Sequence, residues 1–296
     1  MAFLKMKKKV LFIYNPISGA NKKKAIPDLV KANLDLDKYS YEIWPTEAPG
    51  HAALLSNKGR TDGFEIVTAI GGDGTINEIG NDLAGTNTVL GIIPNGSGNG
   101  LARHLGLSLN IKKAIGHINE GKTGKIDVGS VNGKLFFCTS GVGFDAFIGK
   151  KFAESTKRGF KTYLKTTLAE FVNYQPEEYS IKVNGVVMKK KAFLVSFANA
   201  GQYGNNAYIS PLADIQDGFL DVCIISPFPK IKLIGMGVDL FRKKIHKSPY
   251  VQILKAKEIL LQRVDKGEIH LDGEPFEMGR ELSVKILPSA LNVIVP

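Results

Sequence analysis

The stretch Phe64–Ala84 reads FEIVTAIGGDGTINEIGNDLA, and it decides the fold of the first half of the chain. Its apolar run Ile66–Ile70 predicts a buried strand, which Gly71-Gly72-Asp73-Gly74 then breaks. From Thr75 onward apolar residues recur at helical spacing, so a helix is expected. A glycine turn at a helix N-terminus presents unpaired backbone N–H groups to an anion, which favours phosphate.

Asp73 is unexpected in such a turn, because a carboxylate beside a phosphate repels it. A divalent cation between the two groups, or a substrate hydroxyl that Asp73 orients, would remove this conflict. The turn therefore predicts a site for a magnesium nucleotide. The alternative is a tight strand-to-helix turn in which Asp73 is only a cap.

The composition is that of a globular protein with an anionic partner. The 296 residues suffice for two domains with cores, and Cys138 and Cys223 form neither a metal-ligand pattern nor a disulfide framework, so a reducing compartment is expected. We expect no signal peptide and no membrane-spanning segment. The net charge of +11 suits a nucleotide, a nucleic acid or an acidic membrane face, although each short lysine run alone is most simply a solvated face.

Strands and helices alternate up to about residue 120, which predicts a parallel sheet with helices on both faces. The expected strands here are Lys9–Tyr14, Tyr41–Trp44, Ile66–Ile70 and Thr88–Ile93. Three glycine-bearing loops, at 15–19, 71–75 and 95–100, come after the carboxyl ends of strands. Ligands of open α/β sheets bind at that edge, so the three loops together predict one nucleotide site.

After about Lys125 the pattern predicts a mostly antiparallel β domain, with helices near Phe160–Asn173 and Lys230–Ile245. The turns Asn132-Gly133 and Asn184-Gly185 predict hairpins. The expected strands are Ile126–Val131, Lys134–Ser140, Tyr179–Val183, Val186–Met188, Ala192–Ala198, Phe219–Ile225, Val251–Leu254, Ile259–Val264, Glu268–Leu271 and Leu282–Ile286. With no low-complexity linker between the halves, we expect the active cleft between packed domains.

Two further glycine motifs are poor candidates for a phosphate site. Gly116–Thr123 spells a Walker A motif but comes after an amphipathic helix, whereas a P-loop comes after a strand and opens a helix. Gly121 is interpreted as the stop of that helix. Gly141–Ala146 resembles a dinucleotide fingerprint but lies in the β half, so a close-packed turn is expected.

Four motifs occur along the chain in one order. They are Asn15-Pro16-Ile17-Ser18-Gly19, Gly71-Gly72-Asp73-Gly74-Thr75, Pro94-Asn95-Gly96-Ser97-Gly98-Asn99 and Asp272-Gly273-Glu274. Together they resemble the diacylglycerol kinase catalytic family, which includes sphingosine kinases and bacterial soluble lipid kinases. The resemblance covers essentially the whole chain and implies ATP-dependent phosphorylation of a lipid hydroxyl. It also implies an α/β domain of Rossmann-like, NAD kinase-like type over 1–125, a β-sandwich over 126–288, and a strand within 289–296 that returns to the first domain.

The resemblance implies roles for individual residues. ATP contacts are implied for Asn15, Pro16, Ile17, Ser18, Gly19, Thr46, Gly72, Asp73, Gly74, Thr75, Ile76, Asn77, Glu78 and Ser97. The general base is implied at Glu274, or at Asp73 as in sphingosine kinases, and Asp127 is implied to organise metal or substrate. A structural Mg²⁺ is implied on the Asp217 side chain and the backbone oxygens of Asp214 and Phe219. Phosphoryl transfer needs positioning, a metal and a group that receives the hydroxyl proton, and these carboxylates can serve those needs.

Several alternatives stay open at this point. The Asp272–Glu274 segment is otherwise a plain polar hairpin, and Asp217-Gly218 an ion-free turn. Bacterial diacylglycerol kinases usually carry Asp where this chain has Gly100, which raises a sphingoid base or another lipid alcohol as the acceptor beside diacylglycerol. A kinase of a soluble metabolite, such as an NAD kinase, is disfavoured by the Asp272–Glu274 and Asp214–Gly218 segments. A non-catalytic basic binding module lacks the aromatic platform or recognition helix of a nucleic-acid reader.

The expected partner is a lipid substrate at an anionic membrane surface, with no nucleic acid; a homodimer is compatible with the sequence. The expected location is cytoplasmic, with peripheral association at the inner face of the membrane. The basic, amphipathic segment Lys230–Lys247 can lie on a bilayer surface. The simpler interpretation is an ordinary helix packed on the β domain.

Overall fold

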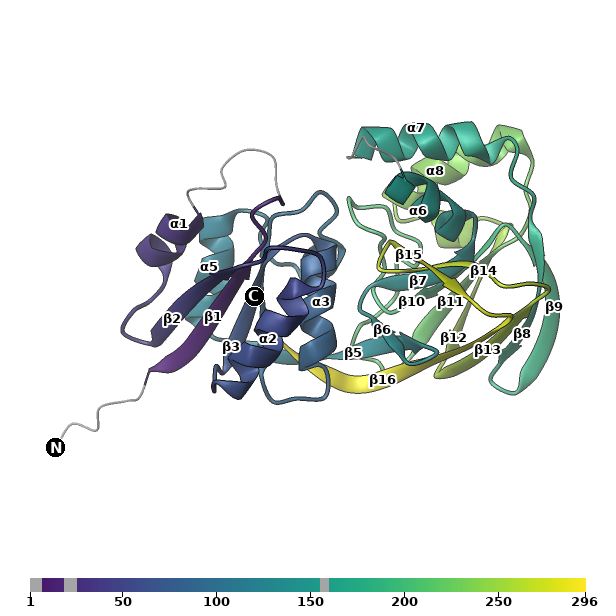
Figure 1. The fold of residues 1–296 in the computed structure, drawn as a ribbon. Helices are drawn as coiled ribbons and strands as arrows, with labels where there is room; N and C mark the ends of the chain where they lie inside the picture. The colour runs from purple at the N-terminus through teal and green to yellow at the C-terminus, as the bar shows by residue number, and fades with distance from the viewer. Residues whose placement is uncertain (1–6, 19–25, 155–159) are drawn as a thin grey trace. The chain divides into compact units, whose positions relative to one another are not determined.

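The structure is a computed structural model that describes residues 7–18, 26–154 and 160–296. The chain divides into two compact units. Unit 1 comprises Met1–Ile126 and Ser289–Pro296, and unit 2 comprises Asp127–Pro288. Figure 1 labels the strands and helices of each unit.

Unit 1 is built on a parallel sheet whose strands have the order β2-β1-β3-β4-β16. Its strands are β1 (Lys8–Tyr14), β2 (Tyr39–Pro45), β3 (Ile66–Gly71), β4 (Val89–Pro94) and the end of β16 (Glu281–Ile294). Every residue of β3 is buried, as expected for a parallel strand that is covered on both faces. The last part of β16 pairs in parallel with β4 through Val293 and Leu90, so the C-terminal strand returns to this sheet.

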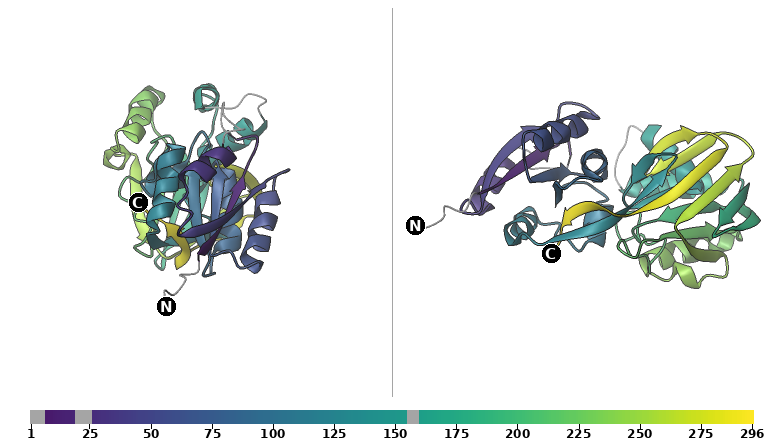
Figure 2. Two further views of the ribbon diagram at one scale, coloured as in Figure 1. Left: turned by 90° about the vertical axis from the view of Figure 1, so that its left-hand side faces the viewer. Right: turned by 90° about the horizontal axis from the view of Figure 1, so that it is seen from below.

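Helices cover both faces of the parallel sheet (Figures 1 and 2). They are α1 (Ile26–Asn33), α2 (His51–Thr61), α3 (Asp73–Leu83), α4 (Gly100–His104) and α5 (Ile111–Glu120). Val10 and Phe12 of β1 share a core cluster with α1 and α5. Leu11 points the other way, and a Cβ on Gly59 of α2 would lie 2.3 Å from its side chain. The alternation along β1 therefore serves two helical layers.

Unit 2 is an antiparallel β-sandwich with two sheets. One sheet contains β5 (Thr123–Val131), β6 (Lys134–Phe136), β8 (Glu177–Val183), β9 (Val186–Ala192), β13 (Glu258–Arg263) and the first part of β16. The other has the order β12-β11-β10-β7-β14-β15, with β7 (Thr139–Gly143), β10 (Leu194–Ala198), β11 (Leu220–Ile225), β12 (Val251–Ala256), β14 (Gly267–Leu271) and β15 (Glu274–Met278). Residues from both sheets form one buried core, among them Tyr179 and Leu261 from the first and Val195 and Phe197 from the second. The predicted fold class is confirmed.

Helices gather at one end of unit 2 (Figure 1). They are α6 (Phe144–Glu154), α7 (Phe160–Phe171) and α8 (Leu233–Phe241), with the short 3-10 turns η2 (Lys230–Lys232) and η3 (Ile245–Lys247) on either side of α8. An aromatic cluster joins them to the sandwich. Within it the ring centroids of Phe171 and Phe228 are 5.4 Å apart, and those of Phe144 and Phe193 are 4.5 Å apart.

The two Asn-Gly hairpins are confirmed. Asn132-Gly133 and Asn184-Gly185 have positive φ at both residues, as a type I′ turn requires, and they join β5 to β6 and β8 to β9. Gly121 ends α5 with φ of 69°, so the Walker-like spelling does lie on a helix and its stop.

Some expected elements differ in detail from the observed ones. Lys134–Ser140 is two strands, because the backbone N–H groups of 137–139 bond to a side chain instead of continuing the ladder. Gly141–Ala146 is close-packed as expected, since a Cβ on Gly143 would lie 2.8 Å from the Phe193 carbonyl oxygen, but it joins β7 directly to α6 instead of forming a separate turn. Leu282–Ile286 is only the first half of β16, which continues into the returning strand.

Candidate active site

Three loops meet at the carboxyl edge of the parallel sheet in unit 1. Loop 1 is Asn15–Ser18, with Gly19 outside the described residues; loop 2 is Gly71–Thr75; loop 3 is Asn95–Gly100. The Asn95 N–H donates to the Gly71 carbonyl over 2.8 Å, and the Asn95 side-chain amide donates to the Ser18 carbonyl over 3.3 Å. Asn95 therefore ties the three loops together, as their positions after β1, β3 and β4 predict.

Loops 2 and 3 are in backbone contact, and glycines make this possible. A Cβ on Gly96 would lie 2.4 Å from the Gly72 Cα, and a Cβ on Gly98 would lie 2.6 Å from an Asp73 carboxylate oxygen. Real Cβ atoms do not approach so closely, so a side chain at either position would push the loops apart. The contact lies directly before the α3 N-terminus, where an anion is favoured.

Asp73 caps a helix, although not its own. Its two carboxylate oxygens accept the backbone N–H groups of Asn99, over 2.8 Å, and of Gly100, over 2.7 Å. Gly100 is the first residue of α4, so Asp73 holds the start of α4 against loop 2. Gly72 stands at the N-cap of α3 and has no side chain to offer, so the first turn of α3 is open to an external acceptor.

Glu78 and Thr46 also have structural partners. The Glu78 carboxylate accepts the N–H groups of Gly50, over 2.9 Å, and Ala52, over 3.0 Å, and so caps α2 from α3. Thr46 is buried beside loop 1, where its N–H donates to the Tyr14 carbonyl over 2.9 Å.

The remaining residues with predicted ATP contacts differ in their exposure. Ile76 is buried in the core, so only its backbone can face a ligand, whereas the Ile17 side chain is 81% exposed. Pro16 lies in loop 1, Ser97 is exposed in loop 3, and Gly74, Thr75 and Asn77 lie in the first turns of α3.

In unit 2 the Asp272-Gly273 pair forms a third type I′ hairpin, between β14 and β15. Both residues have positive φ, 51° and 87°, and Leu271 pairs with Glu274 across the turn. The Asp272 carboxylate accepts the N–H groups of Phe137, Cys138 and Thr139 over 2.9, 2.7 and 3.1 Å. Asp272 thus fixes the hairpin to the start of β7, and Glu274 opens β15 with an exposed side chain.

A polar cluster of His270, Asp145 and Tyr203 is bonded to this hairpin, and the sequence did not predict it. The His270 Nε2 is 3.2 Å from the Asp145 Oδ2, which also accepts the Tyr203 hydroxyl over 3.1 Å. The Nδ1 of the same imidazole accepts the Gly273 N–H over 3.3 Å. Because Nδ1 accepts the Gly273 N–H, the ring proton is on Nε2, which donates to Asp145. His270 therefore links Asp145 to the turn that precedes Glu274. Asp145 belongs to the Gly141–Ala146 motif, whose spelling had indicated only a close-packed turn.

Asp127 and the Asp214–Gly218 segment are brought together in unit 2. Asp127 is 1% exposed, and its carboxylate accepts the Gly218 N–H over 2.7 Å. The Asp217 carboxylate accepts the Phe219 N–H over 2.9 Å and forms an ion pair with Lys255. That pairing raises the pKa of Lys255, because the Asp217 hydrogen bond favours the ammonium form.

At the predicted Mg²⁺ position, a cation would therefore compete with Lys255 for the Asp217 carboxylate. The Lys255 ammonium holds the Asp217 oxygen that a cation would need, and the Asp214 carboxylate accepts the Gln216 N–H over 2.9 Å. In the described part of the chain no three His, Cys, Asp or Glu side chains gather as a metal cluster. An ion here would depend on backbone oxygens and water with one carboxylate, and it would have to displace Lys255.

Comparison with known proteins identifies the family. Residues 9–131 match the diacylglycerol kinase catalytic domain, and residues 139–295 match the YegS C-terminal NAD kinase beta sandwich-like domain. The chain belongs to the diacylglycerol kinase catalytic family. It is accordingly an enzyme of the lipid kinase class.

Relatives match this lipid kinase along nearly its whole length. The diacylglycerol kinase of Bacillus subtilis (strain 168) is 27% identical over 280 residues, which cover 90% of each chain. That of Staphylococcus aureus (strain bovine RF122 / ET3-1) is 27% identical over 286 residues, covering 91% of this chain and 87% of the relative. A crystal structure of a diacylglycerol kinase from Bacillus anthracis str. Sterne shares the fold, with a TM-score of 0.74 at 22% identity over 98% and 97% of the two chains. Among the described residues no helix is long and apolar enough to cross a membrane.

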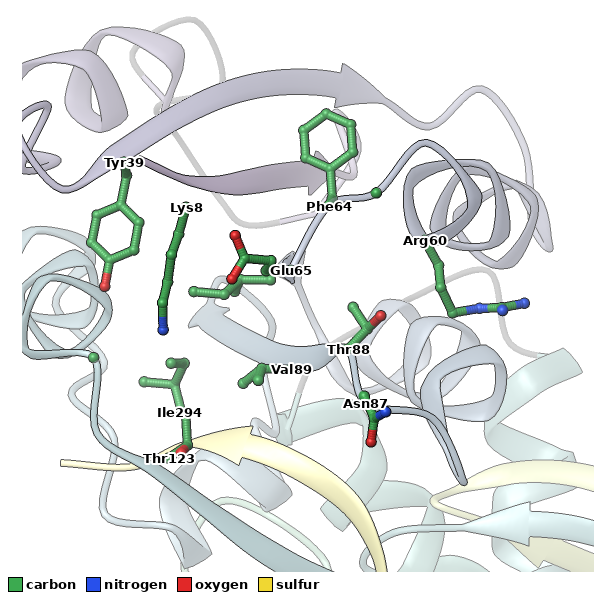
Figure 3. A pocket seen from close by; sticks show the side chains of 13 residues that line it. Lys8, Tyr39, Arg60, Phe64, Glu65, Asn87, Thr88, Val89, Thr123 and Ile294 are labelled. Carbon is green, nitrogen blue, oxygen red and sulfur yellow. The ribbon is translucent and has the colours of Figure 1, made fainter. Parts of the chain in front are cut away.

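Unit 1 of the kinase has a pocket of about 520 Å³ (Figure 3), and no residue of the three glycine loops lines it. Lys8, Tyr39, Ile66 and Val89 line it, and these are the first residues of β1, β2, β3 and β4. The pocket is therefore at the amino edge of the parallel sheet, whereas the loops lie at the carboxyl edge. None of the predicted site residues lines it.

Proposed function

We propose that this kinase transfers the γ-phosphoryl group of ATP to the hydroxyl of a membrane lipid, either diacylglycerol or a sphingoid base. The observation that carries the proposal is the α3 N-terminus, uncapped by a side chain at Gly72 and flanked by the backbone contact between Gly72 and Gly96. Such an end binds the phosphates of ATP through backbone N–H groups and the helix dipole. The relatives that bear the name diacylglycerol kinase favour the first acceptor, and Gly100 favours the second.

Mg²⁺ bound with ATP would neutralise charge that builds up on the phosphates during transfer. Asp73 is the residue of unit 1 that fits this ion, since a carboxylate oxygen can accept two partners. It can therefore hold a cation or its water while the backbone N–H groups of Asn99 and Gly100 stay bonded. With the ion bound, the repulsion between Asp73 and phosphate would be removed.

Glu274 is the residue that we assign to the proton of the acceptor hydroxyl. It follows a hairpin turn that is anchored through the Asp272 carboxylate and the Gly273 N–H, and its own side chain is exposed. A carboxylate on such an anchored turn can receive the proton as the hydroxyl oxygen bonds to phosphorus and the bond to ADP breaks. We place the reaction at the cytoplasmic face of an anionic membrane, where the acceptor lipid resides.

The test is a transfer assay with radiolabelled ATP and Mg²⁺ on three acceptors side by side: diacylglycerol, sphinganine and NAD. We expect label in a lipid, and the lipid that becomes labelled decides between the two acceptors. Label in NAD alone would refute the lipid assignment. No ATP turnover with any acceptor, from protein shown to be folded by circular dichroism, would favour a non-catalytic binding module.

A further inference from the structure

An apolar stripe lies exposed along η2 and α8 of unit 2. Ile231, Ile234, Val238 and Phe241 are 88%, 75%, 40% and 44% exposed. Their spacing of three, four and three residues puts them on one face of the helical segment. We call these four side chains the α8 stripe.

The opposite face of α8 already has a partner within unit 2. Met236 is buried in the aromatic cluster, and Leu233 and Leu240 pack against that cluster. The helix is therefore anchored by one apolar face, while the side chains of a second apolar face are 40–88% exposed. A surface helix that is apolar on both sides is typical of an element that docks on something apolar.

Basic residues stand at both ends of the α8 stripe. Segment 230–247 carries six of them against one acid, Asp239. The basic residues are Lys230, Lys232, Arg242, Lys243, Lys244 and Lys247. An apolar strip between two groups of cations matches the acyl boundary and the phosphate layer of an anionic bilayer.

We propose that the α8 stripe and the basic residues around it dock this kinase on an anionic phospholipid membrane. The four apolar side chains enter the boundary between headgroups and acyl chains, and the cations lie against lipid phosphates. The surface deepens the proposed function, since it states how the enzyme reaches a lipid acceptor. A second copy of the chain fits less well, because a symmetric contact through this face would bring like charges together.

The test is sedimentation of the full-length protein with vesicles of equimolar phosphatidylcholine and phosphatidylglycerol. The variant Ile231→Glu/Ile234→Glu changes two exposed side chains, so it should fold. We expect its vesicle-binding constant to fall about tenfold or more. Each substitution removes an apolar side chain from the membrane boundary and puts a carboxylate beside anionic lipid. The matched control is Val187→Glu/Val264→Glu, with the same charge change at side chains 60% and 73% exposed on β9 and after β13. The control should bind like the parent.

A second variant separates charge from insertion. Lys230→Gln/Lys232→Gln should weaken binding to the anionic vesicles by about fivefold for each lysine and leave binding to pure phosphatidylcholine vesicles unchanged. Equal binding by the parent and Ile231→Glu/Ile234→Glu would overturn the proposal. So would a change in oligomeric state with no change in vesicle binding, which would assign the face to a second copy.

The binding assay needs neither ATP nor an acceptor, so its outcome is independent of the transfer assay. If the proposed function holds, Ile231→Glu/Ile234→Glu should keep its activity on acceptor dispersed in detergent and lose it on acceptor in vesicles. If no lipid is phosphorylated at all, the stripe can still be judged from sedimentation alone.

Discussion

The glycine turn at Gly71–Thr75 in unit 1 and the hairpin at Leu271–Glu274 in unit 2 each place an aspartate beside a glycine. In both, the aspartate bonds to the backbone of another segment. Asp73 accepts two N–H groups at the start of α4, and Asp272 accepts three, from the two residues before β7 and the first residue of β7. The two turns lead into different elements, since loop 2 continues into the N-terminus of α3, whereas the hairpin continues into the exposed Glu274.

This difference suggests separate roles, one structural and one chemical, for carboxylates that look alike in the sequence. A short aspartate side chain in a turn reaches neighbouring backbone donors easily, so its first role is to fix loop positions. We therefore expect Asp73 to act by holding loop 3 and the metal. Glu274 is the carboxylate that we assign to the chemistry, and substitutions at the two turns can test this division.

The largest effect is expected for Glu274→Gln. Loss of a general base typically lowers the rate by about 10²–10⁴-fold, and a residue on the surface of a hairpin contributes little to folding. We expect kcat to fall by that factor, with the free energy of unfolding and the ATP affinity unchanged. The matched control is Glu277→Gln, on the same strand, whose ion pair with Lys266 is exposed. A fully active Glu274→Gln would show that Glu274 is not the general base.

Asp73→Asn should behave differently, because it removes an acceptor and a charge at the α4 cap. Hydrogen bonds to charged groups are worth about 1.5–3 kcal/mol, so the free energy of unfolding should fall by an amount of that order. ATP binding in the presence of Mg²⁺ should weaken in parallel. The measurements are urea unfolding and calorimetric titration with ATP. If activity vanished while the free energy of unfolding and the ATP affinity stayed at the parent's values, Asp73 would act in the chemical step, as we propose for Glu274.

Gly96→Ala tests the backbone contact between loops 2 and 3. The added Cβ would lie 2.4 Å from the Gly72 Cα, so the loops must separate. We expect a cost of about 1–3 kcal/mol in stability and at least about tenfold weaker ATP binding. Gly116→Ala is the control, since its Cβ would meet nothing within 4 Å inside α5. That change should stabilise the protein by about 0.5–1 kcal/mol without touching ATP binding.

The sequence predicted features that depend on local signals. The strand-turn-helix at Phe64–Ala84 and the Asn-Gly hairpins arise from residues that are adjacent in the chain, and the structure has them. The polar cluster escaped because its members are distant: Asp145 and His270 are separated by 125 residues, and Asp272 and Phe137 by 135. No periodicity or turn chemistry reports such pairs. The helix α6 was missed because the glycines at the end of β7, Gly141 and Gly143, indicated a turn, whereas the strand continues directly into a helix.

That cluster gives the next prediction, on the hairpin side of the comparison. If His270 positions Glu274 through the Gly273 N–H, then His270→Gln should lower kcat about tenfold and leave the KM for ATP unchanged. Asp145→Asn should have a similar effect, and the double variant should cost less than the sum, because both act through one chain of hydrogen bonds. If the two residues were purely structural, the substitutions would lower stability without lowering kcat selectively at an unchanged KM for ATP. Additive effects would show that the two residues act separately.

The smallest effect concerns a third aspartate-glycine turn, Asp217-Gly218, where the partner of the carboxylate is Lys255. The raised pKa of Lys255 means that its ammonium is favoured by folding, so the pair adds stability below the ordinary lysine pKa and loses it as pH rises through the raised value. Because the pair is partly exposed, Lys255→Met should cost only about 0.2–1 kcal/mol at neutral pH, and the difference should disappear at strongly alkaline pH.

Lys255→Met also removes the competitor for a cation at Asp217. Added Mg²⁺ should then raise the melting temperature of the variant more than that of the parent, since an ion bound only to the folded state stabilises it. Lys255→Met/Asp217→Asn is the control and should show no such gain. If Mg²⁺ raises the melting temperature of the parent as much as that of Lys255→Met, the ion and Lys255 do not compete. The turn would then hold the ion through its backbone oxygens, with the Asp217 carboxylate still paired with Lys255.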